Sequence, residues 1–230
     1  MIPLQFETAG REGLDILCLG AHCDDIEIGC GGALLKLMGQ YPVTQELWEA
    51  VMGENPAYFK GTDRPVETVS WHDTQAFLEK LNYKLNLKGK QMYRLSTEAE
   101  WEFAARGGIY SQGFSYAGSE DLEQVGWSWE NSQHQTQPVG LLQPNELGLY
   151  DMSGNVWEWC QDRWDSKYYE QCHQEGIVPN PRGPESGQSR VVRGGSWRSG
   201  ASDCRVADRH NLAPDFRNRL IGLRLSRTAL

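Results

Sequence analysis

Apolar residues recur at helical spacing in three short stretches between residues 44 and 108. The first predicted helix lies between a capping Thr44 and a terminating Gly53. Its apolar residues are Leu47, Trp48 and Val51. Because they fall on one side of a helix, we expect that side to pack against a core.

Two further helices carry the same kind of start signal. The second begins after Ser70, with Asp73 in its first turn. The third begins after Thr97, which forms a capping-box pattern with Glu100, and it ends at residues 107–108. The apolar residues of the second helix are Phe77, Leu78, Leu81 and Leu85, and those of the third are Trp101, Ala104 and Ala105.

Glycine, proline and aromatic residues dominate the chain after residue 108. The chain holds nine tryptophans and 25 glycines, a combination typical of irregular structure. Tryptophan buries a large area, and glycine accepts the positive φ angles that loops need. We therefore predict an α+β, loop-rich fold in which short strands follow the three helices.

A boundary near residue 39 divides the chain into two unlike parts. Residues 14–19 are apolar and predict a buried strand, which a polar turn and a helix from about Gly32 to Met38 would follow. A single strand and helix cannot bury a core of their own. We expect residues 1–38 to be a fragment rather than an independent domain, and residues 39–230 to form the main domain.

Composition excludes several functional classes. No run approaches the roughly eighteen apolar residues of a membrane-spanning helix, so no membrane protein is expected. The first residues lack a basic segment followed by an apolar run, which predicts a cytoplasmic protein. The six cysteines contain no C-x-x-C pair and are expected to be free thiols. The formal net charge of −9 disfavours nucleic-acid binding.

Positive charge is concentrated at the end of the chain, where residues 190–230 contain nine arginines and three aspartates. The arginines either form a basic patch for an anionic partner or are tied internally to carboxylates and carbonyls. We favour the internal interpretation for the five that belong to the regular frame described next. These are Arg193, Arg205, Arg209, Arg217 and Arg224.

A frame of regular residues alternates with irregular positions over the last part of the chain. The frame residues are Arg193, Gly194, Gly195, Ser196, Trp197, Cys204, Arg205, Arg209, Pro214, Asp215, Arg217, Gly222 and Arg224. The irregular positions are Arg198, Ser199, Gly200, Ser202, Asp203, Asp208, His210, Asn211, Leu212, Ala213, Phe216, Asn218, Arg219 and Leu220. Such a frame is expected where a rigid scaffold presents interchangeable side chains to a partner.

The second part of the chain resembles the formylglycine-generating-enzyme (sulfatase-modifying factor) domain. Five landmarks carry the resemblance, in the family's order: residues 41–45, 65–71, 94–102, 148–159 and 193–197. The resemblance implies a variant of the C-type lectin fold, with short helices and small antiparallel sheets. One departure is that the strands which usually precede the Tyr41-Pro42-Val43-Thr44 element are missing or replaced.

The oxidase chemistry of that family is not expected in this chain. The resemblance implies copper bound by two cysteines, which fall on Ser199 and Cys204. Copper(I) prefers thiolates, and a serine hydroxyl is a poor substitute. We therefore expect no copper and no enzymatic activity. Related iron-dependent sulfoxide synthases use histidines of an additional helical domain, and the histidines here lack metal-ligand spacing.

A structural calcium site is also implied by the resemblance. The family wraps one Ca²⁺ with the segment that corresponds to residues 151–158. Here Asp151 and Glu158 would supply carboxylates, and Gly154 and Val156 would supply carbonyl oxygens. The alternative is that the two carboxylates satisfy local backbone donors while the neighbouring tryptophans belong to the core.

The frame at the end of the chain resembles the variable proteins of diversity-generating retroelements, many of which use this fold. Their diversified codons never encode Lys, Gln, Glu, Met or Trp, and none of those five occurs at the fourteen irregular positions. The resemblance implies a ligand-binding variable region at about residues 190–225. We expect the ligand to be a protein, with Phe216, Leu212 and Leu220 as apolar anchors. For Phe216 and Leu220, core packing is the alternative.

The first part of the chain resembles the opening of zinc-dependent deacetylases of the PIG-L type. His22 and Asp25 match two zinc ligands, and Asp24 matches the base that activates water. Cys23 replaces the usual proline, and the later part of the chain, which should supply a third ligand, belongs to a different domain. We therefore interpret this part as a remnant and expect no zinc.

Overall fold

The computed structural model describes residues 36–176, 178 and 180–228. The helices are α1 (Gln45–Met52), α2 (Trp71–Lys84), α3 (Glu98–Ala105), α4 (Leu122–Val125) and α5 (Tyr168–Glu175), with the short 3-10 helices η1 (Gly89–Gln91), η2 (Gly108–Tyr110) and η3 (Ala201–Cys204). The strands are β1 (Lys36–Met38), β2 (Gly126–Trp127), β3 (Ser153–Gly154), β4 (Trp157–Arg163), β5 (Arg190–Arg193), β6 (His210–Leu212), β7 (Ile221–Gly222) and β8 (Ser226–Thr228).

The three helices predicted from the sequence are confirmed together with their caps. Thr44 caps α1, which ends at Gly53 in the left-handed conformation. Ser70 and Thr97 each form a complete capping box at the start of α2 and α3. These local contacts satisfy the backbone donors of the first helical turn, so sequence alone was sufficient to place the helix starts.

The main sheet has four strands in the order β6-β5-β4-β7. β5 runs antiparallel to both β4 and β6, whereas β4 and β7 are parallel. A second small pair, β2 and β3, is also parallel. The expectation of antiparallel sheets is therefore correct for only part of the molecule. β6 lies at one edge of the main sheet, next to the chain segments that hold most of the irregular positions.

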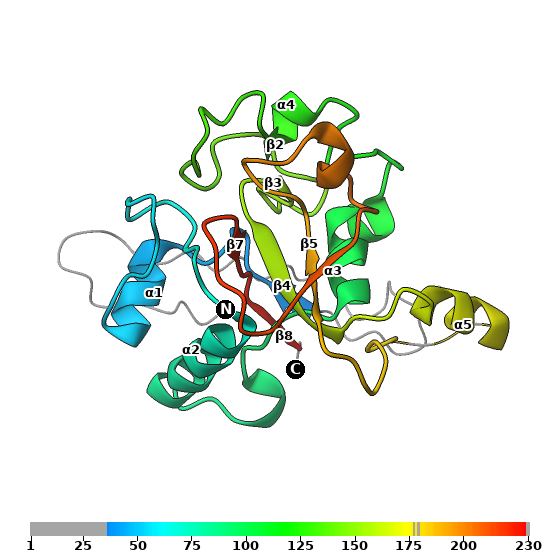
Figure 1. Cartoon of the computed structure of the whole chain (residues 1–230), viewed down its shortest axis with the longest axis horizontal. Coiled ribbons are helices and arrows are strands. Elements are labelled where there is room, and N and C mark those ends of the chain that lie inside the picture. Colours follow the sequence, from blue (N-terminus) through cyan, green and yellow to red (C-terminus); the bar gives the residue numbers. More distant parts are fainter. Residues whose placement is uncertain (1–35, 177, 179, 229–230) are drawn as a thin grey trace.

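Side chains of β4 alternate between two cores. Trp157 and Trp159 belong to the larger core, which also contains the apolar faces of α1 and α2. Cys160 belongs to the smaller core with Trp101 of α3. Glu158 accepts a hydrogen bond from Trp101 Nε1 at 2.7 Å. In Figure 1, α1 and α2 accordingly lie on one side of β4 and α3 lies on the other.

The predicted helix from about Gly32 to Met38 is wrong at its described end. Residues 36–38 form β1, which pairs antiparallel with β8. The Gly39 amide continues the contact by donating to the carbonyl of Leu225 at 2.8 Å. The apolar spacing of so short a segment does not distinguish helix from strand, and the partner strand lies almost two hundred residues away in sequence. Residues 14–19 lie outside the described residues.

Candidate functional site

The irregular positions gather on two loops and the edge strand between them. Loop A comprises residues 198–209 and contains η3, and loop B comprises residues 213–220 and leads into β7. Strand β6 joins the two loops, and in the described part of the chain it is an edge strand that pairs with β5. In Figure 1 these segments form the orange-to-red part of the ribbon around β4, β5 and β7.

Exposure separates the irregular positions from the frame. Thirteen of the fourteen irregular residues are exposed or half-buried, whereas eight of the thirteen frame residues are buried. The exposed residues are Arg198, Gly200, Ser202, His210, Ala213 and Phe216, and the half-buried ones are Asp203, Asp208, Asn211, Leu212, Asn218, Arg219 and Leu220. The structure therefore brings almost the whole predicted set to the molecular surface.

Ser199 is the exception and corrects the sequence interpretation. Its side chain is buried, and its hydroxyl accepts a hydrogen bond from the Ser196 amide at 3.1 Å. Ser199 therefore stabilises the base of loop A and offers no contact to a ligand. Leu212 and Leu220 are intermediate, because both pack partly against the larger core. Phe216, by contrast, is 43% exposed and is not a core residue.

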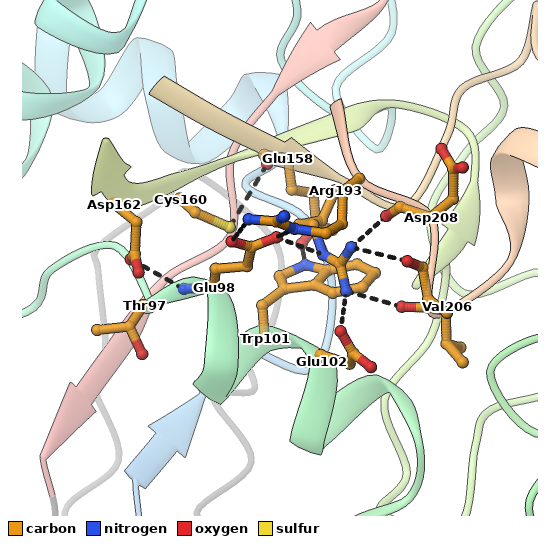
Figure 2. Close-up of polar contacts among 12 residues, drawn as sticks. Thr97, Glu98, Trp101, Glu102, Glu158, Cys160, Asp162, Arg193, Val206 and Asp208 are labelled. Atoms are coloured by element: carbon orange, nitrogen blue, oxygen red, sulfur yellow. Dashed lines mark hydrogen bonds and ion pairs between the residues drawn. The ribbon is translucent and has the colours of Figure 1, made fainter. Parts of the chain in front are cut away.

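Loop A is held from beneath by Arg193, as Figure 2 shows. The buried guanidinium donates to the carbonyl oxygens of Val206, at 2.9 Å, and of Asp208. The same group forms an ion pair with Glu102 of α3. Because one planar cation bonds both the loop backbone and a helix, the end of loop A is fixed relative to the core.

Arg209 adds a second attachment for loop A. Its Nε and Nη2 atoms donate to the two oxygens of Glu98 at 2.6 and 2.8 Å. The guanidinium also lies over the rings of Trp164 and Tyr169 at 4.5 and 4.0 Å. Glu98 is itself buried, and its amide donates to Asp162 Oδ2 at 2.9 Å. Loop A is thus joined to the start of α3 through paired charges.

Loop B is attached to the start of α2. Arg217 donates to both oxygens of Asp73, at 2.6 and 2.8 Å. The amides of Trp71 and Thr68 donate to carbonyls of loop B, those of Pro214 and Asn218, at 3.0 Å each. Backbone contacts of this kind do not depend on the side chains of the loop, so neighbouring positions can change without loss of the attachment.

The internal interpretation of the frame arginines is confirmed for Arg193, Arg209 and Arg224 but not for Arg217, whose side chain is 52% exposed beside Asp73. Arg193, Arg209, Arg217 and Arg224 each form an ion pair with a carboxylate. The interpretation is wrong for Arg205, which is exposed and donates to the carbonyl of Ser202 at 3.0 Å. A regular pattern in the sequence identifies a frame position but does not reveal whether that position points inward.

Aromatic residues far away in sequence complete the surface. Tyr58 is 65% exposed and Trp129 is 45% exposed. The Trp129 amide donates to the Ser199 carbonyl at 3.0 Å, and the Arg219 guanidinium lies 5.3 Å from the Tyr58 ring centroid. The sequence alone did not assign either aromatic residue to this surface, because only the tertiary structure places their loops beside loops A and B.

The two positions that correspond to the copper-binding cysteines do not form a thiol pair. Ser199 occupies the first position, and Cys204 at the second is buried and free. Burial raises the pKa of the Cys204 thiol to about 12, and the nearby Asp203 carboxylate acts in the same direction. A thiol with this pKa is protonated at neutral pH and is a poor metal ligand or nucleophile.

The predicted calcium ligands do not fit a calcium ion as they stand. Glu158 Oε1 accepts from Arg224 Nε and Nη2, and Oε2 accepts from Arg224 Nε and Trp101 Nε1. Both oxygens are therefore already engaged by protein donors. Asp151 Oδ2 accepts from the Gly140 amide at 2.8 Å, and Oδ1 is buried without a hydrogen-bond partner. Gly154 and Val156 are buried beside them.

The zinc-ligand candidates His22 and Asp25 lie outside the described residues. Among residues 36–176, 178 and 180–228, no three His, Cys, Asp or Glu side chains are grouped so that they could hold a metal ion. Across the same ranges, no helix is both long and apolar enough to cross a membrane.

The family is decided by a match over most of the chain. A family model described as the Sulfatase-modifying factor enzyme 1-like domain matches residues 26–229. The chain belongs to this family. The match confirms the resemblance inferred from the five sequence landmarks, and it begins ahead of the boundary predicted at residue 39.

Three comparisons place the chain within the Sulfatase-modifying factor enzyme 1-like family. The solved structure of Treponema denticola variable protein 1 is 34% identical, with a TM-score of 0.73 and 84% of each chain covered. A Paenibacillus barcinonensis protein named Chaperone protein LppX is 36% identical over 77% of this chain and 76% of its own. The formylglycine-generating enzyme of Streptomyces coelicolor is 38% identical over 73% of this chain.

The likeness to a solved variable protein confirms the predicted fold, a loop-rich α+β fold of the C-type lectin kind. The chain spans only about half of the Streptomyces enzyme, 54% of its length. The chain is therefore similar both to a named enzyme and to a named variable protein, and similarity alone does not decide between the two roles.

Proposed function

We propose that this protein is a ligand-binding variable protein of a diversity-generating retroelement. Hypervariable side chains at about residues 198–220, without Ser199, form its binding surface, and the scaffold beneath them stays constant. The observation that carries the proposal is that thirteen of the fourteen irregular positions are exposed or half-buried, whereas most frame residues are buried. A segment that had evolved only for stability would not need its irregular positions on one surface.

The attachment of the loops supports the same proposal. Loop A is held through Arg193 and Arg209, and loop B through Arg217 and backbone amides of the α2 start. A binding surface that must tolerate many substitutions needs support from residues outside the variable set. The TM-score of 0.73 to a protein named as a variable protein agrees with this function.

The ligand is proposed to be a protein. The surface combines exposed aromatic side chains at Tyr58, Trp129 and Phe216 with the charged residues Arg198 and Asp208. Aromatic and arginine side chains dominate the binding energy of protein interfaces. Enzymatic activity is not part of the proposal, because the cysteine pair of the oxidases is incomplete and the remaining thiol is buried and protonated.

The gene itself provides the first test. Sequencing of the DNA beside the coding region should reveal a near-copy of codons 190–225 that differs from the gene at adenines of the copy. A near-copy that differs at other positions would change which residues vary. Absence of a near-copy, together with copper-dependent thiol oxidation by the purified protein, would favour the oxidase function of the family instead.

A binding experiment tests the function at the protein level. Libraries that vary only the exposed positions Arg198, Ser202, His210, Ala213 and Phe216 should yield folded variants that bind different protein targets. Matched libraries that vary the frame residues Trp197 and Cys204 should yield few folded variants, because both side chains are buried. Equal loss of folded protein from both libraries would show that the exposed positions are structural.

A further inference from the structure

The exposed and half-buried irregular positions of loop A, β6 and loop B are called the variable surface. One arginine of this surface differs from the frame arginines in its partners. Arg193, Arg209, Arg217 and Arg224 each pair with a carboxylate. Arg219, at a half-buried irregular position of loop B, forms no ion pair with any carboxylate in the described part of the chain. The donors of its guanidinium are therefore available to a group outside the protein.

Three aromatic rings hold the Arg219 guanidinium in place. Its central carbon lies 5.3 Å from the ring centroid of Tyr58, 5.9 Å from Phe59 and 5.5 Å from Trp197. These distances are within the range of cation–π attraction. The rings also support one another, since Phe59 packs edge-on against both Tyr58 and Trp197, at 4.9 and 5.4 Å.

The backbone of the same residue is fixed as well. Trp197 Nε1 donates to the Arg219 carbonyl at 2.9 Å, and Trp197 is a buried frame residue. Both the backbone and the charged group of Arg219 thus rest on the scaffold. An arginine that is already ordered loses less conformational entropy on binding than a free surface arginine.

The charges around the aromatic rings favour an anionic partner. Lys60 follows Phe59 in sequence and Arg198 follows Trp197, and both are exposed. Glu67 lies close to Phe59 but is buried, and its oxygens accept hydrogen bonds from the Phe59 amide and the Thr68 hydroxyl. Glu67 therefore does not occupy the Arg219 donors, and the exposed residues that directly follow Phe59 and Trp197 in the sequence both carry positive charge.

We propose that Arg219, clamped by Tyr58, Phe59 and Trp197, is the anchor for a carboxylate side chain of an acidic protein ligand. The proposal rests on the proposed function and names the chemical class of its ligand. A guanidinium binds a carboxylate through two parallel hydrogen bonds, which adds direction as well as charge. The net charge of −9 over the whole chain makes nucleic-acid phosphate the less suitable anion.

Selection of random peptides on the full chain tests this assignment. The wild type is compared with Arg219→Ser, Arg219→Lys and Arg205→Ser, each first shown to melt as the wild type does. Arg205→Ser is the control, because Arg205 is an exposed cation of loop A and takes part in none of the cation–ring contacts among the described residues. Affinities of individual selected peptides are then measured for all four proteins.

Peptides selected on the wild type are expected to be rich in Asp and Glu. Arg219→Ser should lower the affinity for these peptides about tenfold or more, equivalent to a loss of about 1.4 kcal/mol in binding free energy. Arg219→Lys should recover part of the affinity, because it keeps the charge but loses the planar fork. Arg205→Ser should change the affinity less than about twofold.

Four results would overturn the assignment. Selected peptides without an acidic excess would leave the variable surface intact as a binding site but remove Arg219 as a carboxylate anchor. Equal losses in Arg219→Ser and Arg205→Ser would show a general charge effect. If a DNA oligonucleotide competes with the peptides and the competition requires Arg219, the anion that Arg219 binds is a phosphate and not a carboxylate. Absence of any peptide that depends on loops A and B would contradict the proposed function as well.

Discussion

Arg224 and Glu158 form a buried ion pair in the centre of the domain, with 2.8 Å between Arg224 Nη2 and Glu158 Oε1 and both side chains 1% exposed. Arg224 also donates to the carbonyls of Gly39, Gln40 and Tyr150. One guanidinium therefore joins the final part of the chain to residues 39–40, to Tyr150 and to β4. The pair links segments that only the completed fold brings together.

Removal of one member of this pair should destabilise the protein strongly. Arg224→Met leaves the Glu158 carboxylate buried without its cation, which should lower the free energy of unfolding by about 3–5 kcal/mol. Urea unfolding measures the change. Arg217→Met is the control, since its pair with Asp73 is partly exposed, and it should cost about 0–1 kcal/mol. Equal losses in the two variants would contradict the central role of Arg224.

Calcium should leave the stability of the wild type unchanged. A ligand that binds only the folded state raises the melting temperature, but Glu158 is saturated by Arg224 and Trp101. Thermal melting in excess calcium and in excess chelator is therefore expected to give the same midpoint. A higher midpoint in calcium that disappears in Asp151→Asn would show that the family's calcium site forms in this chain after all.

Acidification from pH 8 should stabilise the protein through Asp162. Burial raises the pKa of this carboxyl from 3.8 to about 7, and the charges of Glu98 and Glu100 act in the same direction. Between pH 7 and about 4 the folded state therefore binds more protons than the unfolded state, so stability increases as the pH falls. The effect is lost above pH 7, where Asp162 is charged in both states.

Asp162→Asn isolates this contribution. An amide oxygen can still accept the hydrogen bond from the Glu98 amide, so the start of α3 should be retained. The variant should be more stable than the wild type at pH 8 by on the order of a few kcal/mol, with a flatter dependence of unfolding free energy on pH. If the variant keeps the wild-type pH dependence of the unfolding free energy, the group responsible for it is not Asp162.

Substitutions on the variable surface should lower the free energy of unfolding by amounts that depend on how deeply the side chain is buried. Phe216→Ser and His210→Ser alter exposed side chains and should change the free energy of unfolding by less than about 0.5 kcal/mol. Leu212→Ser and Leu220→Ser remove contacts with the larger core and should each cost more than about 1 kcal/mol. Melting of the four variants checks both expectations. A large loss in Phe216→Ser would place that ring in the core.

Local patterns in the sequence were sufficient to predict several features of the structure. The caps of α1, α2 and α3 were predictable because a capping side chain bonds backbone within its own turn. The five landmarks were sufficient to identify the family, which the match to residues 26–229 confirms. Trp197 and Cys204 were correctly expected in the scaffold, since both are buried.

Other features depend on contacts between distant residues, and the tertiary structure decided them. Residues 36–38 form a strand because β8 lies beside them, and Ser199 is buried because its hydroxyl bonds the Ser196 backbone. Sequence indicated that the C-terminal arginines have internal partners but not which carboxylates they bind. Arg219 has three aromatic rings around it because the fold brings residues 58–59 next to loop B, and among the described residues it has no carboxylate partner. The spacing of residue types along the sequence predicts local geometry. Burial and charge pairing depend on contacts throughout the packed molecule.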